Sequence, residues 1–290
     1  MEIAETVENA NLDSVWVGDS LTAKPRLEPL SVLAAIATKT KRVRIGTAVM
    51  LGALRHPVLL AHSAATVDLI SGGRLVLGLG VGGAFNKAQQ QEWRNAGIDP
   101  VSRATRFEEV TELVKRLTRG ETVTYDGHHF SIKDVKISPI SPNQNGTHIL
   151  IACHWHAGKD RQFLRAATLG DGYISISDQP GEYAKVTTRV REHAMEHNRN
   201  FDLMERAFYM TINLNHDRKS ASNEANEFLN SYYGMNIWKD KWGPYGPAEL
   251  VIEQIHRYIS VGTQTIIMRF ASFNQERQLD TFLNKVVPFF

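Results

Sequence analysis

The sequence has few of the features that mark secreted or membrane proteins. Cys153 is the single cysteine among 290 residues, so no disulfide can form within the chain. The longest apolar runs fall short of the roughly 18 residues that a membrane helix requires. The first residues, Met-Glu-Ile-Ala-Glu, lack the basic and apolar parts of a signal peptide. We therefore expect a cytoplasmic protein that does not enter membranes.

An excess of either charge is also missing. Lys and Arg number 33 against 31 Asp and Glu, which leaves a formal net charge of +2. Such a balance does not provide the cationic surface that neutralises nucleic-acid phosphates, so nucleic acid is not an expected partner. The composition, 42% hydrophobic and 22% charged, is that of a soluble globular protein with a large core, and it excludes disorder and coiled coil.

Short β-branched runs alternate with amphipathic stretches along the whole chain, and no linker interrupts them. This alternation predicts parallel strands joined by helices, and over about 250 residues it most often means a TIM (β/α)8 barrel. The predicted strands are 14–19, 43–50, 74–80, 148–153, 172–177, 206–215 and 263–270. The clearest helices are 57–71, 103–119, 159–169 and 247–261. We therefore expect one α/β barrel domain over residues 1–290.

The pattern departs from a regular barrel in three places. A helix over residues 2–10 precedes the first predicted strand, so the usual first strand of the barrel is missing. The insertion 120–147 alternates around Asp126-Gly127, which predicts a β-hairpin. The insertion 229–246 reads as a loop, either a lid over an apolar ligand or a small satellite core. It carries Tyr232, Tyr233, Met235, Trp238, Trp242 and Tyr245.

A glycine-rich stretch, Gly78-Leu-Gly-Val-Gly-Gly83, matches the dinucleotide-binding pattern G-x-G-x-x-G and follows a predicted strand. The pattern requires a helix directly afterwards and then a strand that ends in an acid, whereas residues 96–100 read as a loop before another helix. We reject the dinucleotide interpretation on that context. Glycines at a strand end also let a flat ring lie against the backbone, although a plain tight turn is the simpler alternative.

Two histidines beside Cys153, His154 and His156, raise the question of a metal. Nothing elsewhere in the sequence completes a three-ligand set, so no metal site is expected. The same segment continues through Gly158, Lys159 and Asp160 into a helix, where free backbone amides and the helix dipole favour an anion. An ordinary solvated surface loop is the alternative.

Two charged residues stand at the ends of predicted strands, Asp19 after the first and Arg269 near the end of the last. In a barrel both positions belong to the catalytic rim, so we take Asp19 and Arg269 as candidate catalytic residues. A buried ion pair is the structural alternative, because such pairs also place charges at strand ends.

Several blocks together resemble the bacterial luciferase-like, flavin-dependent oxidoreductases. They are Leu12-Asp-Ser-Val-Trp-Val-Gly-Asp19, Arg44-Ile-Gly-Thr-Ala-Val49 with Arg55-His-Pro57, and Asp68-Leu-Ile-Ser-Gly-Gly-Arg-Leu-Val-Leu-Gly-Leu-Gly80. Later blocks, Leu169-Gly-Asp-Gly-Tyr173 and Gly246-Pro-Ala-Glu-Leu-Val251, are similar too, so the resemblance covers nearly the whole chain. The family fold is a TIM barrel, in agreement with the strand pattern.

The resemblance implies reduced FMN, or its deazaflavin relative coenzyme F-420 (F420), at the C-terminal mouth of the barrel. It places a non-proline cis peptide at Ala48–Val49 under the ring. It also implies cofactor contacts at Thr47, Ala48, Val49, Gly80 and Gly82, and a phosphate at Gly158, Lys159 and Asp160.

Three functions follow as alternatives. The first is a flavoprotein monooxygenase that uses reduced FMN and oxygen on a small organic substrate, with a separate flavin reductase as a further partner. The second is F420-dependent hydride transfer, and the third is a flavin-binding barrel without turnover. Many family members have a catalytic His directly after the acid of the second strand, but Ser20 follows Asp19 here. Helices 26–39 and 57–71, rich in Ala and Leu, together with the resemblance, imply a homodimer.

Overall fold

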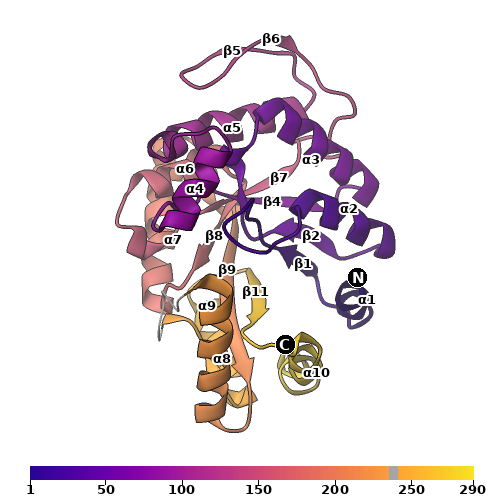
Figure 1. Ribbon diagram of the computed structural model, residues 1–290, viewed down its shortest axis with the longest axis vertical. Coiled ribbons are helices and arrows are strands. Elements are labelled where there is room, and N and C mark those ends of the chain that lie inside the picture. The colour runs from indigo at the N-terminus through magenta and orange to yellow at the C-terminus, as the bar shows by residue number, and fades with distance from the viewer. Residues whose placement is uncertain (235–240) are drawn as a thin grey trace. The chain divides into compact units, whose positions relative to one another are not determined.

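All of the predicted strands are present in the computed structural model, which describes residues 1–234 and 241–290. The chain divides into two compact units. The first is Met1–Ala152 with Arg165–Tyr173, and the second is Cys153–Leu164 with Ile174–Phe290. Figure 1 labels most of the helices and strands of both. Helix α6 (Arg161–Leu169) and strand β8 (Gly172–Ile176) contribute residues to each unit.

The first unit is a parallel sheet whose strands are joined by helices. Its strands are, in spatial order, β1 (Ser14–Val17), β2 (Arg44–Thr47), β4 (Leu75–Gly80) and β7 (His148–Ala152), and the short β3 (Met50–Leu51) pairs with β4. Its helices are α1 (Glu2–Asn9), α2 (Pro29–Lys39), α3 (Pro57–Ser71), α4 (Lys87–Asn95) and α5 (Arg103–Thr118), with the 3-10 turns η1 (Gly52–Leu54) and η2 (Pro100–Ser102).

Local sequence explains where these elements begin and end. Every residue of β4 is buried, as expected for a strand that helices cover on both faces. Helix α3 begins with Pro57 in its first turn and ends at Gly72, whose φ of 70° is the left-handed conformation that closes a helix. On the same helix Leu59, Leu69 and Ile70 stay exposed. These apolar side chains suit the expected homodimer, which stays a prediction.

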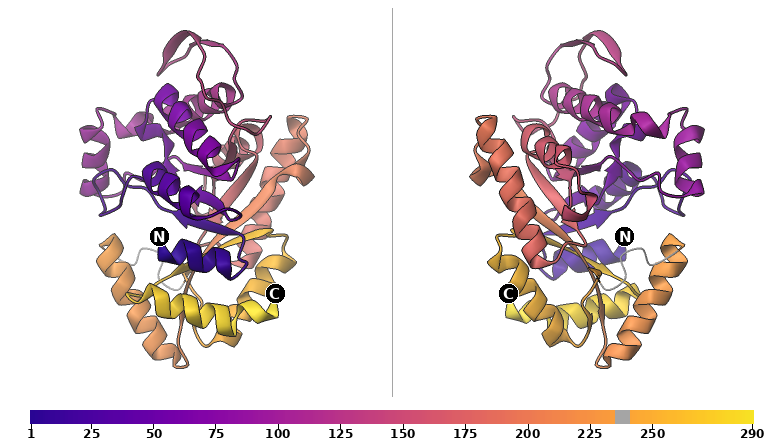
Figure 2. Two further views of the ribbon diagram at one scale, coloured as in Figure 1. Left: turned by 90° about the vertical axis from the view of Figure 1, so that its right-hand side faces the viewer. Right: turned by 90° about the vertical axis from the view of Figure 1, so that its left-hand side faces the viewer.

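The hairpin predicted around Asp126-Gly127 is present as β5 (Val123–Asp126) and β6 (Ser131–Val135), which pair antiparallel. It lies at the margin of its unit, at the top of the view in Figure 1 and of both views in Figure 2. The carboxylate of Glu109 on α5 accepts hydrogen bonds from the backbone amides of His128, His129 and Phe130 at 2.9–3.2 Å. One acidic side chain thus fastens the tip of the hairpin to the unit.

The second unit centres on the long strand β9 (Glu205–Leu214). Strand β11 (Thr265–Phe270) pairs parallel with β9 along six residues, and β10 (Tyr245–Gly246) pairs with its last two. The helices are α7 (Pro180–Glu196), α8 (Arg218–Tyr233), α9 (Ala248–Ser260) and α10 (Gln275–Lys285), with the 3-10 turns η3 (Trp155–Ala157), η4 (Phe201–Leu203) and η6 (Val287–Phe289). The rings of Phe208 on β9 and Tyr258 on α9 stack with centroids 4.0 Å apart, which fixes one face of β9 against α9.

One sequence prediction needs correction and another is supported. The segment 229–246, expected to be a loop, is helical up to Tyr233 because Ala225 and Leu229 bury one face of α8. Met235 and Trp238 of that segment lie outside the described residues. Helix α1 precedes β1, as predicted for residues 2–10. A search of the described helices finds none with the length and apolar character to span a bilayer.

Candidate functional site

Ala48 and Val49, which follow β2 in the first unit, form a partly exposed apolar surface that we call the shelf. The peptide bond Ala48–Val49 is cis, at the position that the resemblance implied. Ala48 and Val49 are partly exposed, whereas their neighbours Thr47 and Met50 are buried. The amide of Ala48 donates to the carbonyl oxygen of Val17 at 2.8 Å, and the Thr47 hydroxyl donates to that of Gly78 at 2.8 Å. Both neighbouring strands therefore hold the shelf in place.

The glycines of β4 make room for this shelf. A β-carbon at Gly78 would overlap the carbonyl oxygen of Thr47, and one at Gly80 would lie 2.7 Å from Cγ2 of Val49. Gly82 has a φ of 82°, and its β-carbon would lie 2.9 Å from the ring of Trp93. Close approach of the chain itself therefore already requires glycine at these positions. Contacts of Thr47, Gly80 and Gly82 with a cofactor stay predictions.

Asp19 forms a buried ion pair beside the shelf. Its side chain is 1% exposed, and Arg55 donates to Oδ2 at 2.6 Å and to Oδ1 at 3.0 Å. The amide of Leu51 also donates to Oδ2 at 2.9 Å. The buried ion pair that was the structural alternative for Asp19 is therefore present in the fold. Its partner is Arg55, which follows the shelf in the sequence. A catalytic role for Asp19 stays a prediction.

Ser20, which stands where many family members have a His, anchors a buried carboxylate. Its hydroxyl donates to Oε1 of Glu92 on α4 at 2.7 Å, and the amides of Thr22 and Ala23 donate to the same oxygen at 2.9 and 3.1 Å. Burial alone would raise the pKa of Glu92, but these hydrogen bonds outweigh it and hold that pKa below its ordinary value. Ser20 and Glu92 together fix the loop that follows β1, a role that no sequence pattern revealed.

In the second unit, the expected phosphate loop has its helix start two residues later than predicted. Gly158 adopts a φ of 63° after η3, and α6 begins at Arg161 rather than at Lys159. The carboxylate of Asp160 accepts hydrogen bonds from Arg189 at 2.8 and 2.9 Å and lies 2.8 Å from Nε2 of His193. Although burial opposes it, this pairing lowers the pKa of Asp160. Asp160 thus ties the loop to α7, and a phosphate at Gly158, Lys159 and Asp160 stays a prediction.

The structure gives His156 two acidic neighbours that sequence reasoning missed. Ligand atoms of His156, Asp178 and Glu182 all lie within 4.8 Å of one another. However, both oxygens of Asp178 accept the amide of Trp155 at 3.0 Å, and Nζ of Lys241 lies 2.8 Å from Nε2 of His156. An ammonium group therefore occupies the surroundings that a metal cation would need.

His154 is expected to make the protein less stable as the pH falls from about 6.5 to 4. Burial, with a smaller contribution from His156, lowers the pKa of His154 to about 4 from its ordinary value of 6.5. Below pH 6.5 the unfolded chain takes up this proton more readily than the folded one, so up to ~3 kcal/mol of stability is lost across that window. Urea unfolding at several pH values measures it. His154→Gln should lose less stability than the parent over this range, and identical losses would contradict the assignment.

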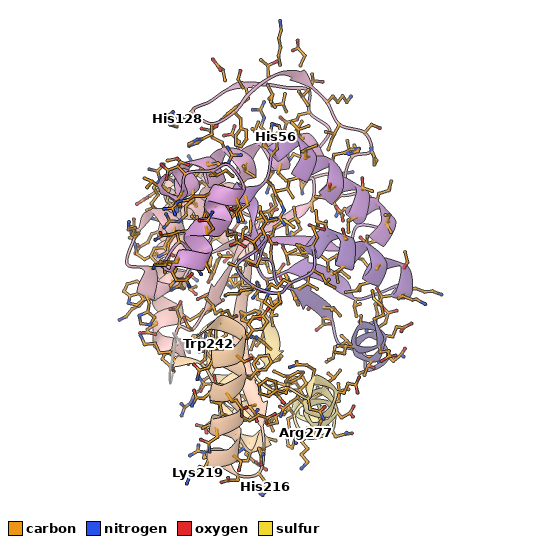
Figure 3. The ribbon with its side chains drawn as sticks, viewed as in Figure 1. His56, His128, His216, Lys219, Trp242 and Arg277 are labelled. Atoms are coloured by element: carbon orange, nitrogen blue, oxygen red, sulfur yellow. The ribbon has the colours of Figure 1, made fainter. Side chains whose placement is uncertain are left out.

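Arg269 points from β11 towards α8. Its guanidinium carbon lies 4.8–5.6 Å from the centroids of four aromatic rings, those of Phe228, Tyr232, Tyr233 and Trp242. Trp242 lies near the end of α8 that is opposite His216 and Lys219 (Figure 3). Tyr232, Tyr233 and Trp242 of segment 229–246 thus lie around the Arg269 cation. A catalytic role for Arg269 stays a prediction.

Comparisons with known proteins agree with this architecture. An F420-dependent glucose-6-phosphate dehydrogenase of Amycolatopsis mediterranei is 27% identical over alignments that cover 99% of this chain and 93% of that protein. Two solved structures superpose over nearly the whole chain. An F420-dependent secondary alcohol dehydrogenase matches with a TM-score of 0.82 at 18% identity, covering 100% of this chain and 94% of the other. The monooxygenase RslO1 of Streptomyces bottropensis matches with a TM-score of 0.83 at 24% identity, covering 99% and 91%.

The same comparisons settle the fold class and the family. The α/β, TIM-barrel class predicted from the sequence is confirmed by the structural matches. A family model described as luciferase-like monooxygenase matches residues 1–265, which is most of the chain. The protein is accordingly an oxidoreductase by descent, and the chain belongs to the luciferase-like monooxygenase family.

Proposed function

We propose that the protein is an F420-dependent oxidoreductase that transfers a hydride between the deazaflavin and a small organic substrate. The observation that carries this proposal is the similarity, over 99% of the chain, to a dehydrogenase that uses F420. Between the functions expected from the sequence, this similarity favours the F420 alternative over the FMN and oxygen reaction that we placed first. The family description alone does not separate the two.

The shelf of the first unit fits a planar ring. Ala48 and Val49 present a small, partly exposed apolar surface at the C-terminal end of β2, where barrel enzymes bind their ligands. When bound, the deazaflavin supplies or accepts the hydride. The residues of this chain would hold the ring flat, because strands β1 and β4 fix the shelf from both sides.

Proton handling in this chain differs from that of family members with a His after the acid. Ser20 donates its proton towards Glu92, and both oxygens of Asp19 already accept hydrogen bonds from Arg55. These two pairs position the loop after β1 and the segment after the shelf. We infer that Asp19 and Ser20 orient the cofactor-binding backbone and that the substrate exchanges its proton with another group.

Equilibrium titration with F420 and with FMN tests the proposal. We expect F420 to bind at least tenfold more tightly than FMN. Val49→Asp should abolish F420 binding, because a charge on the shelf would lose its hydration under an apolar ring. Val101→Asp is the matched control, since Val101 is 83% exposed and its substitution should leave binding unchanged. Tighter binding of FMN, together with oxygen consumption by the reduced flavin, would instead support the monooxygenase.

A further inference from the structure

Arg269 offers a positive charge for which residues 1–234 and 241–290 supply no carboxylate partner. It is partly exposed, and its one hydrogen bond within residues 1–234 and 241–290 goes from Nη1 to the hydroxyl of Tyr233. No Asp or Glu among these residues pairs with it, and neighbouring tyrosines are the groups that favour its charged form against the cost of burial. A guanidinium has five N–H donors, so most of its hydrogen-bonding capacity is left for a ligand.

A buried hydroxyl next to Arg269 also lacks a partner. Thr211 on β9 is the register partner of Arg269 on β11, and paired residues of parallel strands project to the same face. Thr211 is 1% exposed, and its Oγ1 has no hydrogen-bond partner among the described residues. An unsatisfied buried hydroxyl destabilises the fold, so a ligand that bonds to it recovers that loss. The Arg269 guanidinium and the Thr211 hydroxyl, on one face of the sheet, can thus both donate hydrogen bonds to the same ligand.

The walls around these groups are aromatic and partly open. Phe228, Tyr232 and Tyr233 are each partly exposed, and Phe273, 57% exposed, packs edge-on against Phe228 with centroids 5.4 Å apart. Such walls suit a flat, apolar body that stacks on rings. A single guanidinium matches the charge of a carboxylate and binds it through two parallel N–H donors, whereas a phosphate dianion would lose far more hydration against these rings.

We propose that Arg269 and Thr211, walled by Phe228, Tyr232 and Tyr233, form a binding site for the carboxylate of a planar, apolar organic acid. The site belongs to the second unit and lies at the C-terminal end of β11, the end at which barrel enzymes take up substrates. As an assignment of substrate class it rests on the proposed function. The carboxylate would be the anchoring group, and the hydride would exchange elsewhere on the molecule.

Calorimetric titration of the protein without any cofactor tests this site. Benzoate is the probe, benzamide is its neutral analogue, and acetate carries the charge without the ring. We expect benzoate to bind at least tenfold more tightly than either analogue. Equal binding of benzoate and benzamide would overturn the proposal and leave Arg269 as a packed cation without a ligand.

Matched variants separate the site from general effects on folding. Arg269→Met should remove the preference for benzoate over benzamide, and Arg269→Lys should retain part of it. The control is Arg257→Met, because Arg257 is an exposed arginine of the same unit that pairs with Glu253 at 2.6 Å. Thr211→Val should weaken benzoate binding about threefold or more. Thr263→Val removes another buried hydroxyl without a described partner and should have no effect. A full benzoate preference in folded Arg269→Lys and Thr211→Val variants would overturn the proposal even if Arg269→Met did not fold.

These measurements are independent of the F420 titration. A protein that binds F420 but does not prefer benzoate contradicts the carboxylate site alone. A protein that prefers benzoate but does not bind F420 contradicts the proposed function and leaves the carboxylate site standing.

Discussion

Replacement of Arg55 by methionine is expected to lower the free energy of unfolding by about 3–5 kcal/mol, the range for a buried ion pair that loses one partner. The side chain of Asp19 is only 1% exposed and would lose the two hydrogen bonds that Arg55 donates. Among the described residues, the amide of Leu51 would then be the remaining hydrogen-bond donor to that carboxylate. Urea unfolding followed by circular dichroism at pH 7 measures the change.

A second substitution shows whether the unpaired charge is the cause. The double variant Asp19→Asn with Arg55→Met should be more stable than Arg55→Met alone, because the amide removes the buried charge. Arg257→Met is the control for loss of an arginine, and its exposed pair with Glu253 should contribute less than about 1 kcal/mol. If Arg55→Met cost no more than this control, the ion pair would not be what stabilises the segment after the shelf.

The strands and most helices could be predicted because their signals are local. Residues 75–80, for example, are all buried in the fold. A strand that is buried on both faces has a continuous apolar sequence, which identifies it without knowledge of the strands that pair with it. Pro57 starts α3 and Gly72 ends it, and each acts only on the helical turn next to it. Both ends of α3 were therefore predicted correctly. The end of α8 was missed because its aromatic residues resemble those of a binding loop, and only tertiary packing of Ala225 and Leu229 keeps them helical.

The contacts of the candidate site could not be predicted because they join distant residues. Asp19 and Arg55 are 36 residues apart and Ser20 and Glu92 are 72 apart, and nothing in the local sequence marks either pair. Glu182 on α7 reaches His156 because α7 packs beside η3, and Asp178 lies in the turn just before α7. For Arg269 the sequence showed a charge at a strand end and a separate aromatic segment. It did not show that Tyr232 and Tyr233 of that segment pack around the Arg269 guanidinium.

Replacement of Gly78 by alanine is expected to cost at least ~3 kcal/mol of stability, the upper end of the usual range for overpacking. The new β-carbon would overlap the carbonyl oxygen of Thr47, which is backbone and cannot turn aside as a side chain can. That carbonyl belongs to the residue before the shelf, so relief requires β2 and β4 to move apart. Thermal and urea unfolding measure the cost, and F420 titration of any folded fraction measures the damage to the shelf.

Two other glycines of the same unit provide the comparison. Gly52→Ala places its β-carbon 3.7 Å from Leu79 and Phe107, an ordinary contact, and should change stability by less than about 1 kcal/mol. Gly80→Ala meets Cγ2 of Val49 at 2.7 Å, and this side chain can rotate. We therefore expect Gly80→Ala to cost less stability than Gly78→Ala but to disturb F420 binding, because the rotated valine is part of the shelf.

The order of these effects distinguishes the two explanations of the glycine-rich strand. If the glycines accommodate the chain itself, Gly78→Ala should lose the most stability, Gly80→Ala less and Gly52→Ala the least. This ranking should hold with or without cofactor. If they mainly leave room for a bound ring, Gly78→Ala and Gly80→Ala should be as stable as the parent when no cofactor is present and should differ only in F420 affinity. The overlap at Gly78 is with a backbone oxygen that cannot rotate away, so we expect the first order to be observed.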